Sequence, residues 1–167
     1  MVLLQTAVTD RRGGSTLKFK KTNVGETMLM DGGGAAARPG DVIQTVTLDD
    51  LLPFVRALTP SRLALKVDTE GHEFQVLAGG PHLFRSLPLV AVLTEWLFHA
   101  RGPTAGGAAL DRFVSQEGYA PHGGDLVAFF AKKGFAPFHA QTGTPLHGNY
   151  TSWPSNVLWK KLEHVAE

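Results

Sequence analysis

Four ionisable side chains stand within six residues near the middle of the chain: Asp68, Glu70, His72 and Glu73. Neighbouring carboxylates repel each other, which raises the pKa of one of them, and their negative charge also raises the pKa of a nearby histidine. Such a group suits general-base catalysis near neutral pH, and it equally suits the binding of a hard metal ion. It would also suit a solvated turn whose acidic side chains cap a helix. Asp68, Glu70 and His72 are therefore candidate catalytic residues, and spacing alone leaves these interpretations open.

The sequence around these residues predicts a strand, a turn and a helix. Residues 63–67 form an apolar run typical of a buried strand, and residues 73–78 have helical spacing that ends at two glycines. Side chains two residues apart share a face of an extended segment. We therefore expect Asp68, Glu70 and His72 to line one wall of a cleft.

Glu95 follows a second predicted strand, the apolar segment 89–94. Asp68 stands in the same position after the preceding strand. Ligands of open α/β sheets bind at the carboxyl ends of the strands. We therefore expect Asp68 and Glu95 to lie at the same edge of one sheet.

The remaining segments predict an α/β domain. Strands are expected at residues 2–8, 17–20, 42–47, 126–131 and 157–159, and helices at 49–58 and 108–117. Asp50 is the expected N-cap of the first of these helices. Residues 135–155 are rich in Pro, Gly and His and predict a long loop. Helices that alternate with apolar strands favour a sheet covered by helices.

Composition narrows the classes of function. The chain has 167 residues, a net charge of +1 and no cysteine, so it suits one domain and excludes disulfide scaffolds and thiolate zinc sites. No H-E-x-x-H motif occurs, and we assign no metal ligands. A balanced charge gives no field that attracts nucleic acid or an anionic membrane. With no signal peptide or membrane span in the sequence, we expect a cytoplasmic protein with a small-molecule substrate.

The strand, turn and helix resemble the hallmark of one enzyme family. The segment Lys66-Val67-Asp68-Thr69-Glu70-Gly71-His72-Glu73, followed by Val76-Leu77-Ala78-Gly79-Gly80, is similar to the K-[IV]-D-x-E-G-x-E and V-L-x-G-[AG] motifs of FkbM-type S-adenosylmethionine-dependent methyltransferases. Further matches are Ala7-Val8-Thr9-Asp10, Asn23-Val24-Gly25, Thr47-Leu48-Asp49-Asp50-Leu51-Leu52, and Pro88 before the strand that leads to Glu95. The resemblance covers residues 2 to about 120, and residues 121–167 form a loop-rich remainder.

The resemblance implies a class I methyltransferase-like fold, with a mostly parallel, Rossmann-like sheet flanked by helices. It implies S-adenosylmethionine as cofactor and O-methylation of a small-molecule or sugar hydroxyl. Asp68 would lie near the methyl donor or substrate, Glu70 and His72 would be candidate bases, and Glu95 would hold the substrate. Cofactor contacts would come from Asp68 and, at the adenine, from three residues of the first strand: Ala7, Val8 and Asp10.

The resemblance also implies an N-terminally truncated domain. In the family, a Gly-rich cofactor loop and an acidic residue that holds the ribose precede the Ala-Val-x-Asp strand, with which this chain begins. We therefore expect residues 1–167 to form one partial methyltransferase domain. An unpaired sheet edge left by missing strands would favour self-association.

Three alternatives stay open. The chain could be a non-catalytic methyltransferase-like remnant or binding module without cofactor. It could be a metal-dependent hydrolase that uses Asp68, Glu70 and His72. It could also be the product of a truncated gene model.

Overall fold

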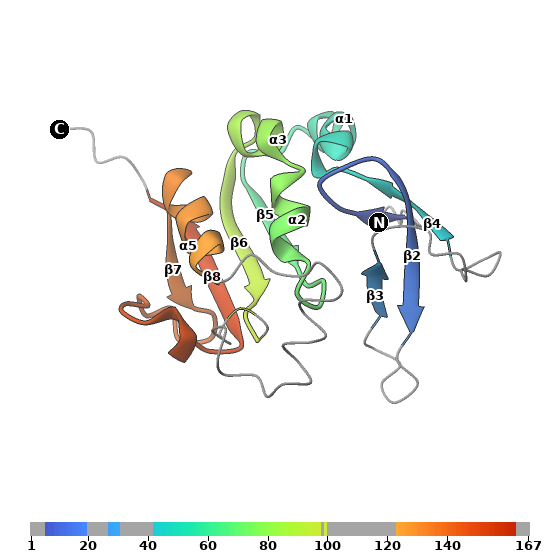
Figure 1. Cartoon of the computed structure of the whole chain (residues 1–167). Coiled ribbons are helices and arrows are strands. Elements are labelled where there is room, and N and C mark those ends of the chain that lie inside the picture. The colour runs from blue at the N-terminus through green and yellow to red at the C-terminus, as the bar shows by residue number, and fades with distance from the viewer. Residues whose placement is uncertain (1–5, 20–26, 31–41, 98, 100–122, 163–167) are drawn as a thin grey trace.

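A computed structural model describes residues 6–19, 27–30, 42–97, 99 and 123–162 of the chain. In this part of the chain the strands form two four-stranded sheets, which lie side by side in Figure 1 with helices packed around them. These strands and helices confirm the α/β class, but both sheets are mixed, where one mostly parallel sheet was predicted. No helix among the described residues is long and apolar enough to cross a membrane.

The first sheet is built from the N-terminal quarter of the chain. Its strands are β1 (Ala7–Val8), β2 (Gly13–Phe19), β3 (Thr27–Met30) and β4 (Val42–Val46), in the order β1-β4-β2-β3. β1 pairs with β4 in parallel, whereas β2 runs antiparallel to both β4 and β3.

The second sheet holds the predicted site. Its strands are β5 (Leu63–Val67), β6 (Leu89–Glu95), β7 (Phe135–His139) and β8 (Asn156–Lys161), in the order β5-β6-β8-β7. β5 and β6 are parallel, and β8 runs antiparallel to β6 and β7, so β5, β6 and β7 share one direction. The two predicted strands that precede Asp68 and Glu95 are thus neighbours.

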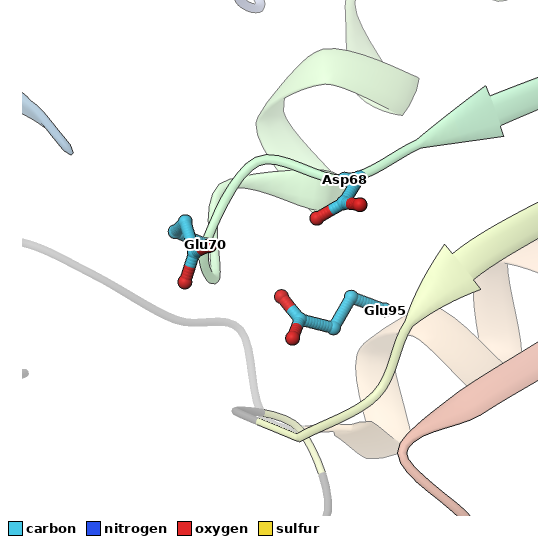
Figure 2. A group of neighbouring side chains, drawn as sticks. All are labelled: Asp68, Glu70 and Glu95. Carbon is cyan, nitrogen blue, oxygen red and sulfur yellow. The ribbon is translucent and has the colours of Figure 1, made fainter. Parts of the chain in front are cut away.

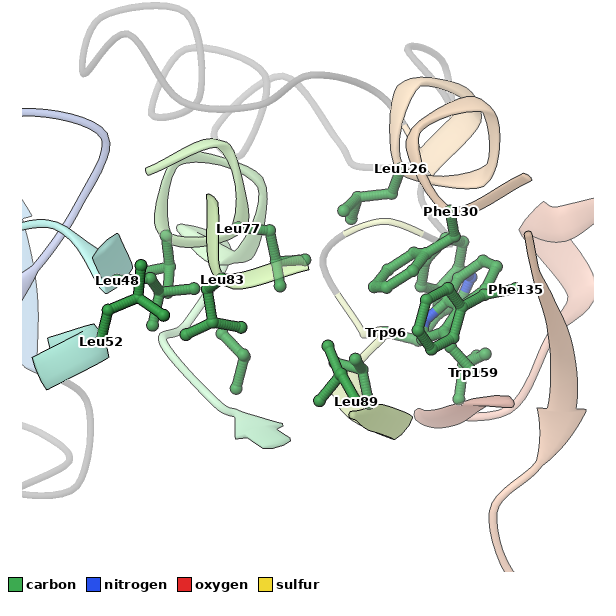
Figure 3. Close-up of a cluster of buried hydrophobic side chains, with 14 residues drawn as sticks. Leu48, Leu52, Leu77, Leu83, Leu89, Trp96, Leu126, Phe130, Phe135 and Trp159 are labelled. Atoms are coloured by element: carbon green, nitrogen blue, oxygen red, sulfur yellow. The ribbon is translucent and has the colours of Figure 1, made fainter. Parts of the chain in front are cut away.

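Short helices connect and cover these strands. They are the 3-10 helix η1 (Leu48–Leu51), α1 (Leu52–Ala57), α2 (Glu73–Ala78), α3 (Pro81–Ser86), α5 (Gly123–Lys132) and the 3-10 helix η2 (Tyr150–Ser152). α2 and α5 lie on the same face of the second sheet (Figures 1 and 3), and their Phe74 and Phe129 rings meet edge to face. This face is where the core forms.

The core has an aromatic and an aliphatic part. Under α5, Phe130 stacks on Trp159 with ring centroids 4.1 Å apart, and Trp96 packs beside them. Figure 3 shows Leu48, Leu52, Leu77 and Leu83 gathered near α2 and η1. Burial of such side chains contributes roughly 1.5–3 kcal/mol each to folding, so this face stabilises the second sheet and the strand ends it carries.

Polar contacts attach the first sheet to α2 and α3. The backbone N–H of Asp49 donates to Gly79 O (3.1 Å), and the Asp49 carboxylate accepts from the N–H groups of His82 and Leu83 at the start of α3. A Cβ on Gly79 would lie 2.3 Å from Thr9 O, so only glycine allows this close approach. The end of β1 is therefore held against α2.

Several predicted elements differ from the structure. Residues 126–131 belong to helix α5 and not to a strand, and the predicted loop 135–155 contains β7 and η2. Thr47 is the N-cap of η1, while Asp50 occupies the third helical position and accepts a hydrogen bond from Thr47 N (2.9 Å), which completes a capping box. The predicted helix 108–117 and residues 2–5 of the first strand lie outside the described residues.

The outer edge of β7 is covered by the chain that follows it. The N–H of His139 donates to Thr144 O (2.8 Å), and the N–H of Leu146 donates to Pro137 O (3.0 Å). Phe138 and Pro145 form an isolated antiparallel bridge. At the opposite edge of this sheet, no described strand pairs with the outer side of β5.

Candidate active site

A tight turn joins β5 to α2 and contains the predicted catalytic residues. Glu70 has φ 54° and Gly71 has φ 96°, both in the left-handed region. Positive φ at these two residues breaks the extended geometry that was predicted for residues 68–72. The turn therefore does not keep the extended segment on which a common face for Asp68, Glu70 and His72 was expected.

Three carboxylates meet beyond the ends of two neighbouring strands. Asp68, Glu70 and Glu95 each offer a carboxylate oxygen within 4.8 Å of the others, as Figure 2 shows. Val67 and Thr94 are partners in the register of β5 and β6, so the residues that follow them emerge side by side. Asp68 and Glu95 thus lie close together at one edge of the sheet, as expected. We call these three residues the carboxylate group.

Burial and nearby negative charge both act on Glu95. Burial raises the pKa of Glu95 to about 7, with further contributions from the negative charges of Glu70 and Asp68. Glu95 Oε2 is buried and has no hydrogen-bond partner among the described residues. Asp68 is partly neutralised by Lys66, whose Nζ lies 2.9 Å from Asp68 Oδ2. Glu95 is therefore the carboxylate that gains or loses a proton near neutral pH.

A second acid, Glu73, holds the turn from behind. Its Oε1 accepts hydrogen bonds from Thr69 N (2.9 Å), Thr69 Oγ1 (3.3 Å) and Gly71 N (3.4 Å). Its Oε2 lies 2.7 Å from Nε2 of His99, and both side chains are almost fully buried, at 0% and 1% exposure. Burial opposes ionisation, but the hydrogen bond and charge of His99 outweigh it and hold the pKa of Glu73 below its usual value. Glu73 thus fixes the backbone that carries Asp68 and Glu70.

His72 contacts the residue that follows β1. It is buried at the start of α2, and a 2.9 Å hydrogen bond joins its Nε2 to Thr9 Oγ1. The Thr9 hydroxyl also lies 3.2 Å from Asp10 Oδ1. His72 therefore links the end of β1 to the turn.

The predicted adenine-contact residues lie on this linked strand. Ala7 and Val8 form β1 and are half-buried, whereas Asp10 is exposed. Among the described residues, no hydrogen bond connects these three side chains to the carboxylate group. Thr9, which follows Val8 in the chain, connects this strand to the turn after β5 through His72.

Sequence reasoning missed the Glu73 to His99 pair. Glu73 was recognised only as a first-turn acid, and His99 had no ligand-like spacing to other histidines. The two residues are 26 positions apart, and only the parallel pairing of β5 with β6 brings them together. The one local signal for this pair was the position of His99 shortly after the predicted strand 89–94.

Chemically, the carboxylate group favours a positively charged ligand. Carboxylate oxygens at this separation are the donor type that Mg²⁺ and Ca²⁺ prefer. They equally stabilise an organic cation. One of the carboxylates could also accept a proton from a substrate beside that cation. The arrangement thus combines negative charge with a base that titrates near pH 7.

Comparison with known proteins identifies the family. A model of the methyltransferase FkbM domain matches residues 6–136. None of the curated proteins matches the chain, and no solved structure does. The matched region includes β1, the turn after β5 and the end of β6, and so contains every residue of the carboxylate group. The chain therefore belongs to the FkbM methyltransferase family.

Proposed function

We propose that the protein binds S-adenosylmethionine and methylates a hydroxyl group of a small molecule or sugar. The observation that carries this proposal is the carboxylate group, Asp68, Glu70 and Glu95, at the adjoining ends of β5 and β6. Membership of the methyltransferase family supplies the reaction class. The ends of parallel strands are where α/β sheets bind their ligands.

We further propose a Rossmann-like fold for the second sheet. In its favour, β5, β6 and β7 run in one direction and only β8 is reversed. Helices α2 and α5 cover one of its faces. The parallel pair β5 and β6, which carries the carboxylate group, is the part of this mixed sheet that supports the proposed fold.

The chemistry of the carboxylate group fits this cofactor. S-adenosylmethionine supplies an electrophilic methyl group on a positively charged sulfonium. Asp68 and Glu70 provide negative charge that favours such a cation. Ala7 and Val8 offer half-buried apolar side chains for the adenine, with Asp10 at the exposed end of the same strand.

Within this proposal Glu95 is the general base. A group with a pKa of about 7 is about half ionised at neutral pH and can accept the proton of a substrate hydroxyl. Its Oε2 is buried without a hydrogen-bond partner among the described residues, so a substrate hydroxyl that enters the site would satisfy this acceptor. Asp68 and Glu70 hold and orient the reactants, and positioning of this kind supplies much of the rate of a methyl transfer. His72 acts as a link to β1 through Thr9.

Calorimetric titration of the full chain with S-adenosylhomocysteine tests the proposal. We expect micromolar binding, weakened at least about tenfold by Asp68→Ala because one charge-assisted contact is lost. Asp125→Ala, an exposed acid on α5, is the matched control and should bind like the unchanged chain. Absence of binding by a cooperatively folded chain would instead favour a non-catalytic remnant.

The same titration with Mg²⁺ separates the methyltransferase from a metal-dependent hydrolase. A hydrolase would require the divalent ion to bind more tightly than S-adenosylhomocysteine and to raise the melting temperature, with both effects lost in Glu70→Gln. We expect S-adenosylhomocysteine to bind equally well with and without a chelator.

A further inference from the structure

A cavity lies at the end of the β5–β8 sheet that is opposite the carboxylate group. Its volume is about 600 Å³. The residues that line it come from α3, from α5 and the turn after it, and from the end of β8: Phe84, Arg85, Phe129, Lys132, Lys133 and Lys161. We call this the basic pocket.

The basic pocket is distinct from the carboxylate group. Lys161 pairs with Phe135, the first residue of β7, whereas Glu95 is the last residue of β6. Because β6 and β7 run in the same direction, the two sites lie at opposite ends of the sheet. A seven-residue strand spans roughly 20 Å, so one small ligand does not reach both sites.

Aromatic rings lie against two of the cations of the basic pocket. Lys133 Nζ lies 4.9 Å from the centre of the Phe84 ring and 4.8 Å from that of Phe129, and these two rings meet edge to face at 5.4 Å. Lys161 Nζ lies 5.0 Å from the Phe135 ring and donates a hydrogen bond to Lys133 O. Two ammonium groups are therefore held by contacts that leave their positive charge uncompensated.

The positive charges of the basic pocket repel one another. Burial lowers the pKa of Lys133, and the charges of Arg85, Lys132 and Lys161 lower it further, while Asp49 acts in the opposite direction. In the described part of the chain no carboxylate forms an ion pair with any of the four cations. A bound anion would relieve this repulsion.

Stabilisation of helix ends explains only part of this arrangement. Arg85 and Lys132 lie in the last turns of α3 and α5, where positive charge favours the helix dipole. Lys133 directly follows α5, and Lys161 donates to Lys133 O at the same helix end. Helix stabilisation does not account for the convergence of four cations from α3, α5 and β8 on one cavity.

We propose that the basic pocket binds the polyphosphate group of a small ligand. Lysine and arginine are the residues that bind phosphate oxygens, and a di- or triphosphate matches the charge of four cations better than a single carboxylate does. The cavity volume lies within the range of sites for small molecules. The polyphosphate could be free or part of a nucleotide, since the Phe84 and Phe129 rings offer apolar surface beside the cations.

The test is calorimetric titration of the full chain with inorganic tripolyphosphate and, separately, with ATP in the absence of divalent ions. We expect saturable binding that weakens as salt is raised. Lys161→Gln and Lys132→Gln should each weaken binding about tenfold, the loss expected for one charge-assisted contact. Lys160→Gln is the matched control, because Lys160 is the neighbouring β8 cation and lies over Phe138, outside the pocket.

The affinities for tripolyphosphate and ATP distinguish the two sources of the polyphosphate. Equal affinity for both probes assigns the site to the polyphosphate alone, and tighter binding of ATP assigns it to a nucleotide whose base contacts the rings. Either result supports the proposal. A folded chain that binds neither probe overturns it, and so does equal weakening by Lys160→Gln and Lys161→Gln, which would indicate non-specific attraction.

Discussion

One end of the β5–β8 sheet gathers carboxylates and the other end gathers cations, and the two ends are built differently. At the carboxylate end, the turn with Asp68 and Glu70 is held from behind by the buried pair Glu73 and His99. At the basic end, Lys133 and Lys161 rest on aromatic rings, and the described residues form no buried polar network behind them. Buried polar groups that hydrogen-bond to the backbone fix its geometry, whereas long lysine stems allow adjustment. We infer that the first end is preorganised and the second adapts to its ligand.

The largest effect is expected from Glu73→Ala. This change leaves His99 and the N–H groups of Thr69 and Gly71 without their acceptor in a buried environment. Removing one partner of a buried charged pair costs about 3–5 kcal/mol of unfolding free energy. Urea denaturation measures the loss. Glu73→Gln keeps an acceptor for the turn and should cost about 1–2 kcal/mol. If both variants stay within experimental error of the unchanged chain, the turn does not depend on this pair.

A smaller, pH-dependent effect is expected from Glu95→Gln. The pKa of Glu95 in the folded chain is about 7, above the ordinary 4.5, so folded protein binds this proton more tightly than unfolded protein does. The unchanged chain therefore loses stability relative to the variant as pH rises from 4.5 to 7. Because Glu95 is only partly buried, solvent screening limits the gain of the variant at pH 8 to about 1 kcal/mol. Thermal unfolding at pH 4 and pH 8 measures it. A variant that is less stable at pH 8 would contradict the repulsion described for this end.

The smallest effect is expected from Lys132→Gln at the basic end. The substitution relieves repulsion with Lys133 but removes a favourable charge from the last turn of α5, and each contribution is a few tenths of a kcal/mol. We expect a net change below about 0.5 kcal/mol in unfolding free energy at low and high salt. A loss of several times that size would show that the basic end also supports the fold, and would remove the contrast between the two ends.

The sequence patterns located the central strands well and the flanking elements poorly. β5 and α2 begin and end where the apolar run and the helical spacing predicted. In α5, the run from Leu126 to Phe130 is apolar throughout, and short apolar runs do not distinguish helix from strand by periodicity. β7 was missed because Pro137 argues against a strand, yet β7 is an edge strand, where proline is tolerated.

The same contrast applies to the candidate site. The proximity of Asp68 and Glu95 was predictable, because parallel neighbouring strands end together. The contact of His72 with Thr9 was not, since it spans 63 positions, and neither was the positive φ of Glu70, a residue type that seldom adopts it. The partner of Glu73 was also beyond prediction, because a contact across 26 positions leaves no local pattern.

The covered edge of β7 has a consequence for assembly. A sheet with two open edges can add copies at both sides and grow into a filament. Here the segment that contains Thr144 and Leu146 occupies one edge through backbone hydrogen bonds, while the outer side of β5 is unpaired among the described strands. We propose that this sheet self-associates through its β5 edge. Such association would join two copies and then stop, because the pair would present only the covered β7 edges of this sheet to a third copy.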